Sequence, residues 1–210
     1  MRKIGKIDVE IVSANIACMN VDVVVVPEFQ GCASYGGVGR AVAQAAAQGM
    51  HEYDTYAKAQ PFSLGSATLT PAGSVFCRYL AHVVTVGCSR EDSFKCIKTA
   101  VEKALVLADL KGAKSIAIPA VGTGVIGSLT LKQSAKAVFG AVAEFASLAQ
   151  NISQVKFVIY RGDPQPAEEV LMDESYLTDA PEVGEKEFSL GAWLYEMCSR
   201  MNNETPETGC

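Results

Sequence analysis

Apolar residues form short runs that alternate with longer amphipathic stretches along roughly the first 160 residues. Short, largely apolar runs rich in β-branched residues predict buried strands over Ile7–Val12, Asp22–Pro27, Ala67–Pro71, Tyr79–Val86, Ser115–Pro119 and Val155–Tyr160. Amphipathic or alanine-rich stretches predict helices over Gly37–Ala47, Phe94–Lys111 and Thr130–Leu148. Ser93 is the predicted N-cap of the second helix. This alternation predicts an α/β fold whose mixed or parallel sheet is covered on both faces.

The alternation stops after Gly162, where the composition changes to Pro, Glu and Asp. Residues 1–166 contain 16 Lys/Arg and 12 Asp/Glu, whereas residues 167–210 contain 2 and 11. We therefore expect one domain over residues 1–162 and an acidic C-terminal extension over 163–210, outside the sheet. Within the extension, Phe188–Met197 holds the only Trp and has an apolar helical face, which would pack on the domain or bind a second chain.

Composition excludes several classes of protein. Apolar residues make up 49% of the 210, which excludes general disorder, and no apolar run approaches the ~18 residues of a membrane-spanning helix. The first residues lack the apolar segment of a secretory signal, so we expect a cytoplasmic protein. The mildly basic body suits a small anionic ligand and is too weakly charged to indicate a nucleic-acid surface. The sequence carries no signal for an oligomeric state.

The seven cysteines are an odd number and contain no C-x-x-C pair. This pattern argues against both a disulfide framework and a zinc site, so we expect reduced, mostly buried thiols. No metal and no cofactor are predicted.

Two glycine-rich loops each follow a predicted strand and lead into a helix. One runs from Val26 to Arg40 and the other from Pro119 to Ser128. Glycines allow the backbone to approach a ligand, and a following helix N-terminus favours phosphate, although the same glycines could simply make tight turns. The second loop contains GTGVIG, a literal G-x-G-x-x-G. It follows a late strand, and the next strand ends in Tyr160-Arg161 rather than in an acid, which disfavours a dinucleotide-binding dehydrogenase.

Taken together, the two loops resemble those of the macrodomain family. The segment SIAIPAVGTGVIG matches the family's second loop closely, and Gly36-Gly37-Val38 match the glycines that open the family's first helix. The resemblance covers about residues 8–160. It implies a three-layer α/β/α fold, macrodomain-like, with a mixed sheet, helices on both faces and a pocket for ADP-ribose.

The resemblance also implies a set of ligand-binding residues. Asn15 and Ile16 follow the first strand and would contact the adenine, and Tyr160 follows the last strand and would pack on the adenine ring. The first loop would lie along the distal ribose with Phe29, Gly36, Gly37, Val38 and Gly39. The second loop would wrap the diphosphate with Gly122, Thr123, Gly124, Val125 and Ile126.

Three of these positions depart from the family pattern. Phe29 stands where hydrolytic members have an asparagine, Gly39 where they have an aspartate, and Asn15 where the family has an adenine-reading aspartate. We therefore expect binding of ADP-ribose, an ADP-ribosylated ligand or a related nucleotide, without efficient turnover. Two alternatives remain open: a hydrolase of ADP-ribosyl groups or ADP-ribose 1''-phosphate with an atypical catalytic set, and an interaction module with a degenerate pocket.

No catalytic residue is assigned from the sequence. Glu28, Cys32 and Tyr35 lie near the first loop, and Glu28 is expected to be a solvated loop acid. Of the two histidines, His51 is expected at the surface. His82 alternates with apolar residues along a strand and is expected to be a satisfied core side chain.

Overall fold

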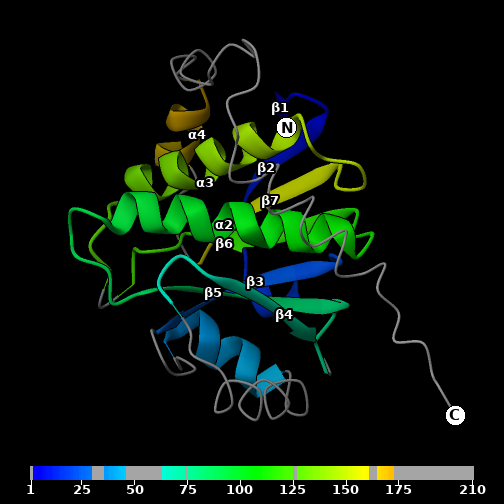
Figure 1. The fold of residues 1–210 in the computed structure, drawn as a ribbon, viewed down its shortest axis with the longest axis horizontal. Helices are drawn as coiled ribbons and strands as arrows, with labels where there is room; N and C mark the ends of the chain where they lie inside the picture. The colour runs from blue at the N-terminus through cyan, green and yellow to red at the C-terminus, as the bar shows by residue number, and fades with distance from the viewer. Residues whose placement is uncertain are drawn as a thin grey trace, which may run out of the picture.

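The computed structural model describes residues 2–29, 36–45, 63–73, 75–124, 127–160 and 165–172. Its centre is a seven-stranded sheet with the order β1-β2-β7-β6-β3-β5-β4 (Figure 1). The strands are β1 Arg2–Ile4, β2 Ile7–Ser13, β3 Val23–Phe29, β4 Ala67–Pro71, β5 Tyr79–Val86, β6 Ser115–Pro119 and β7 Gln154–Ile159. The helices are the 3-10 turn η1 Ile16–Cys18, a helix of residues 37–45, α2 Ser93–Leu110, α3 Leu131–Ala146 and α4 Gln165–Met172.

The sheet is parallel at its centre and antiparallel at its edges. β2, β7, β6, β3 and β5 pair in parallel, while β1 pairs with β2 and β4 with β5 in the antiparallel sense. The mixed α/β sheet is confirmed. β1 was not predicted, because three residues joined by a tight turn to β2 are too short to show a pattern of alternation.

Successive side chains of β3 enter the cores on opposite faces of the sheet. Val23 and Val25 pack with α2 and α3, whereas Val24 and Val26 pack with η1 and Val42 of the helix 37–45. All four valines are fully buried, as a continuous valine run predicts. Figure 1 shows α2 and α3 lying across one face of the sheet, with the helix 37–45 (blue) away from them.

The start of each long helix is fixed by a local hydrogen-bond pattern. α3 begins with a capping box in which Thr130 Oγ1 accepts from Gln133 N–H and the Gln133 side chain accepts from Thr130 N–H. For α2 the predicted N-cap is wrong: Asp92 occupies the cap position and Ser93 is the first helical residue. The Ser93 hydroxyl instead donates to the Ser89 carbonyl, at 2.8 Å.

α4 lies beyond the last strand and packs against α3. Its Ala167 is fully buried in the core formed with α2 and α3. Within the described part of the chain, no helix combines the length and the apolarity needed to cross a membrane.

The cysteines differ from the expectation of buried, reduced thiols. Cys88 and Cys96 form a disulfide, because the end of β5 and the first turn of α2 bring together two residues eight apart in the chain. Cys18 is a free and exposed thiol, and Cys77 is free and half-buried. The other cysteines, Cys32, Cys198 and Cys210, lie outside the described residues.

Candidate functional site

The carboxyl ends of β2, β7 and β6 meet at one edge of the sheet, because these parallel strands are neighbours. In open α/β sheets, this is the edge at which ligands bind. A cavity of about 570 Å³ lies there, which is the size of a small-molecule site. Three groups of described residues line it: Ala14, Asn15 and Ile16 after β2; Pro119, Ala120, Thr123 and Leu131 between β6 and α3; and Val158, Ile159 and Tyr160 at the end of β7.

The remaining wall is one face of the helix 37–45. Gly37, Val38, Arg40, Ala41 and Gln44 all line the cavity. The spacing of Gly37, Arg40, Ala41 and Gln44 is the i, i+3, i+4, i+7 repeat of one helical face. Arg40 and Gln44 were not predicted, because the resemblance of the first loop ends before them. Helical periodicity from Gly37 is the signal that could have found both residues.

The cavity walls are largely apolar, with polar groups at a few points. Of the described residues that line it, Arg40 is the single charged side chain, and it is exposed. The local electrostatics therefore favour an anionic ligand. Tyr160 is 64% exposed, so a large part of its ring is available for contact with another molecule.

Asn15 is held in place by the turn that it begins. Its Oδ1 accepts from Ala17 N–H at 3.1 Å, which caps η1, and the preceding Ala14 N–H continues the pairing with β7 by donating to Ile159 O at 3.0 Å. Ile16 is buried next to it, while Asn15 itself is exposed. An amide oxygen has two acceptor positions, so one remains for a ligand.

The loop after β6 contains a backbone conformation that favours glycine and is held by backbone hydrogen bonds. Gly122 has φ +84°, and a Cβ there would lie 2.6 Å from Ile97 Cδ1 of α2. Leu129 N–H donates to Gly122 O at 3.0 Å, and Gly127 N–H donates to Gly124 O at 2.7 Å. Gly124, by contrast, is open toward the described part of the chain, where a Cβ at this position would meet no heavy atom within 4 Å.

The structure brings together part of the predicted set around the cavity. Six of the predicted residues line it: Asn15, Ile16, Gly37, Val38, Thr123 and Tyr160. Five described residues do not appear in its lining: Phe29, Gly36, Gly39, Gly122 and Gly124. Val125 and Ile126 lie outside the described residues.

Near the first loop, a buried polar chain replaces the solvated acid that the sequence predicted. Glu28 is fully buried within β3, and its Oε1 lies 2.8 Å from His82 Nδ1. His82 Nε2 lies 2.9 Å from Thr70 Oγ1. The prediction for Glu28 is therefore wrong, because β3 continues two residues beyond its predicted end, whereas His82 is confirmed as a satisfied core residue. Neither side chain lines the cavity.

The other candidates for acid–base chemistry, Cys32, Tyr35 and His51, lie outside the described residues. Among the described residues, no three His, Cys, Asp or Glu side chains are grouped to hold a metal ion.

A comparison with protein families matches residues 30–138 to the Macro domain model. The chain belongs to the Macro domain family. This macrodomain is 30% identical to an uncharacterised protein of Mycobacterium tuberculosis over 139 residues, which are 66% of this chain and 38% of that protein. It therefore spans well under half of that relative's length.

Two solved macrodomains share the fold of this macrodomain. The Oceanobacillus iheyensis macrodomain with ADP matches with a TM-score of 0.68 and 19% identity, over 85% of this chain and 95% of that one. The Trypanosoma brucei macrodomain in complex with ADP-ribose matches with a TM-score of 0.64 and 21% identity, over 77% of this chain and 66% of that one. The macrodomain-like α/β architecture expected from the sequence is thus confirmed.

Proposed function

We propose that this macrodomain binds ADP-ribose, free or attached to another molecule, in the cavity at the ends of β2, β7 and β6. The observation that carries the proposal is the character of that cavity. It has the volume of a small-molecule site, largely apolar walls and one cationic side chain, Arg40, among its described lining residues. A ligand with a flat apolar end and a negatively charged middle suits such walls.

The adenine fits best at the end formed by β2 and β7. The Tyr160 ring offers an apolar face for a purine, and the free acceptor position of Asn15 Oδ1 suits the adenine amine. Asn15 is neutral, and a neutral hydrogen bond contributes ~0.5–1.5 kcal/mol where a charged one contributes ~1.5–3. Recognition of adenine is therefore weaker by about 1 kcal/mol than with an aspartate at this position, and it is not lost.

The diphosphate fits between the loop after β6 and the first turn of the helix 37–45. Thr123 belongs to that loop, and Gly37 lies at the start of the helix, the end at which the helix dipole favours an anion. Arg40, one turn further along, adds a full positive charge on the same face.

We further propose that hydrolysis is slow at this site. Phe29 and Gly39 offer no side-chain hydrogen bond at the two positions where the resemblance places the water- and ribose-positioning groups of hydrolytic members. Where such groups provide most of the catalysis, loss of one of them commonly lowers the rate ~10²–10³-fold. The buried Glu28–His82 pair does not line the cavity, so it offers no substitute within reach of a ligand.

The deciding experiment is a calorimetric titration of the full chain with ADP-ribose, beside the variants Gly124→Glu and Gly124→Ala. Gly124 faces open space, so both variants should fold, but the glutamate adds bulk and negative charge beside the expected diphosphate. Binding is expected in the original chain and in Gly124→Ala, and loss of binding in Gly124→Glu. No heat from the original chain would refute the binding proposal, and unchanged affinity in Gly124→Glu would show that the diphosphate does not lie beside residue 124, the neighbour of the cavity residue Thr123.

Turnover is measured separately, as release of ADP-ribose from a modified protein over time. Release at the level of the Gly124→Glu control is expected. Release well above that control would contradict the proposal of slow hydrolysis.

A further inference from the structure

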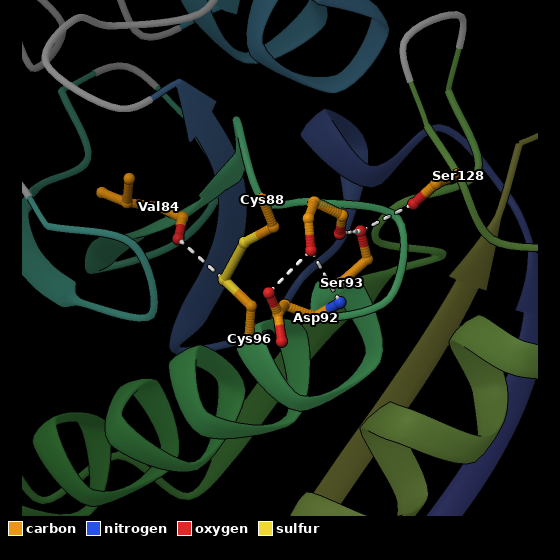
Figure 2. The surroundings of a disulfide bond; sticks show 7 residues. Val84, Cys88, Asp92, Ser93, Cys96 and Ser128 are labelled. Carbon is orange, nitrogen blue, oxygen red and sulfur yellow. Dashed lines mark hydrogen bonds between the residues drawn. A yellow bond between two sulfur atoms is a disulfide. The ribbon is translucent and has the colours of Figure 1, made fainter.

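The disulfide between Cys88 and Cys96 closes a short loop between β5 and α2 (Figure 2). Both cysteines are half-buried. They line an open surface depression of about 250 Å³, together with Ser89, Asp92 and Lys95. A sulfur atom at the wall of such a depression is within reach of a small thiol from solution, unlike a disulfide enclosed in a core.

The residues between the two cysteines are tied to one another. Ser89 Oγ donates to Asp92 Oδ2 at 2.6 Å and accepts from Asp92 N–H at 3.1 Å. Ser93 Oγ donates to Ser89 O at 2.8 Å. The disulfide and these bonds together hold residues 88–96 in one arrangement at the start of α2.

The first turn of α2 contacts the loop after β6, which is the proposed diphosphate-binding loop, at two points. Ser128 Oγ donates to Ser93 Oγ at 2.7 Å, as Figure 2 shows. The side chain of Ile97, the neighbour of Cys96, packs against Gly122: a Cβ built on Gly122 would lie 2.6 Å from Ile97 Cδ1. Gly122 and Ser128 are on either side of Thr123, which lines the cavity, so the first turn of α2 supports both ends of that loop.

We propose that Cys88 and Cys96 form a reversible redox site that controls ligand affinity through Gly122 and Ser128, the two described points at which α2 contacts the loop after β6. In the oxidised form, the disulfide fixes the first turn of α2, so that Ser93 stays in contact with Ser128 and Ile97 with Gly122. In the reduced form the link between β5 and α2 is cut, residues 88–92 gain freedom, and the loop loses part of its support. The part of this inference that concerns affinity rests on the proposed ADP-ribose binding.

The chemistry is thiol–disulfide exchange with a dithiol. One thiolate of the dithiol attacks Cys88 Sγ, the sulfur–sulfur bond breaks, and Cys96 leaves as a thiolate, which the N-terminal turn of α2 stabilises. The second thiol of the reagent then loses its proton and displaces Cys88 from the mixed disulfide. Two protein thiols and one oxidised dithiol result; the protein gains two electrons and two protons, and the dithiol loses them. Oxidised glutathione reverses the reaction by taking the two electrons and releasing two molecules of glutathione.

The first test is chemical and needs no ligand. The full chain is treated with oxidised glutathione or with dithiothreitol, alkylated, and mapped by mass spectrometry. Cys88 and Cys96 should be protected together after oxidation and alkylated together after reduction, while the exposed Cys18 serves as the positive control for alkylation. Independent alkylation of the two residues in both treatments would overturn the proposal.

The second test follows the loop by amide hydrogen exchange and by titration with ADP-ribose. Reduction should speed exchange in residues 120–124 and 127–130 and should weaken ADP-ribose binding about fivefold, at the low end of coupling between sites. Cys88→Ser should match the reduced protein under both conditions, and Cys18→Ser should keep the redox difference. Ser128→Ala, which removes the link to Ser93, should reduce that difference.

The outcomes separate this inference from the proposed function. Absence of ADP-ribose binding in both redox forms would refute the binding proposal, while the exchange data would still test the redox site. If the first test verifies the disulfide, equal amide hydrogen exchange and equal ADP-ribose affinity in the oxidised and reduced proteins would overturn the proposal that the disulfide controls affinity. If Cys88→Ser does not fold, the oxidised and reduced forms of the original chain still give the comparison.

Discussion

Glu28 and His82 are buried polar residues of the neighbouring strands β3 and β5, and they contact each other. The ring N–H at Nδ1 suits donation to the Glu28 carboxylate, which leaves Nε2 for Thr70. The three residues come from β3, β5 and β4, so the chain of contacts crosses three adjacent strands. Buried polar groups are costly when a partner is missing, which makes this pairing specific for one alignment of the strands.

Replacing Glu28 with Ala should lower the free energy of unfolding by about 3 kcal/mol, because His82 keeps its burial and loses an acceptor. Urea denaturation measures the change. Glu28→Gln retains a side-chain oxygen for His82 Nδ1–H and should lose clearly less. Equal losses in the two variants would show that the hydrogen bond is not the source of the effect.

Cys77 illustrates how burial sets reactivity. Desolvation raises the pKa of its thiol to about 11, so at pH 8 only about one molecule in a thousand carries the reactive thiolate. Alkylation of Cys77 by iodoacetamide should be slow at pH 8 and should rise about tenfold per pH unit until about pH 11. Peptide mapping over a time course, with exposed Cys18 as the reference, measures both rates; comparable rates at pH 8 would contradict the prediction.

At the scale of elements, Asp109 anchors the end of α2 to the turn that leads into β7. Its fully buried carboxylate accepts hydrogen bonds from the backbone N–H groups of Gln150, Asn151 and Ile152, at 2.7–3.2 Å. Since Val158 and Ile159 of β7 and the following Tyr160 line the cavity, this anchor also positions part of the candidate site.

Asp109→Ala should cost about 3 kcal/mol of stability, because it leaves three backbone donors without their acceptor. Asp109→Asn keeps one side-chain oxygen and should cost less. Thermal and urea denaturation of both variants measure the losses. A loss below about 1 kcal/mol in the alanine variant would mean that the turn finds other acceptors.

The central elements were predictable from the sequence because their pattern is local. The runs at Tyr79–Val86 and Ser115–Pro119 form strands with the predicted bounds, and the valines of β3 are buried on both faces. Glu28 was misread because its burial depends on His82, a partner 54 positions away. The disulfide was not predicted for a related reason: two cysteines separated by eight positions carry no signal until β5 and α2 are placed side by side.

The candidate site was predictable in location and only partly in composition. Strand ends and glycine-rich loops indicated which edge of the sheet to consider, and Asn15, Thr123 and Tyr160 do line a cavity there. Arg40 was missed although it is one helical turn from Gly37, because no resemblance to a motif drew attention to it. Whether a loop glycine shapes a turn, as Gly122 does, or faces open space, as Gly124 does, depends on contacts that only the fold supplies.

At the scale of the whole molecule, charge is unevenly distributed. The chain has a net charge of −5, yet the described lining of the cavity carries a single positive group. An anionic ligand is therefore attracted by Arg40 and weakly repelled by the net negative charge of the chain. Salt screens both interactions, with a screening length of about 10 Å at 0.1 M.

Raising NaCl from 50 to 500 mM should weaken ADP-ribose binding about threefold. Arg40 attracts the ligand at shorter range than the net negative charge repels it, and because Arg40 is exposed to solvent, salt ions screen this attraction. Arg40→Ala should bind more weakly at low salt and should show a smaller salt dependence. Arg78→Ala removes a partly exposed cation outside the cavity lining and is the matched control. Calorimetric titrations at the two salt concentrations measure this; an identical salt dependence in all three proteins would exclude Arg40 as the electrostatic contact.

The position of β7 has a consequence for how the protein is made. Among the strands of the described residues, β7 comes last along the chain, yet it lies between β2, which comes second, and β6. During synthesis, the edges of β2 and β6 that pair with β7 therefore stay unpaired until residue 159 has left the ribosome. Because residues at the end of β7 also line the cavity, a nascent chain completes the proposed ligand site and the centre of its sheet in the same late step. A ligand present in the cell would then favour the finished sheet over any shorter intermediate.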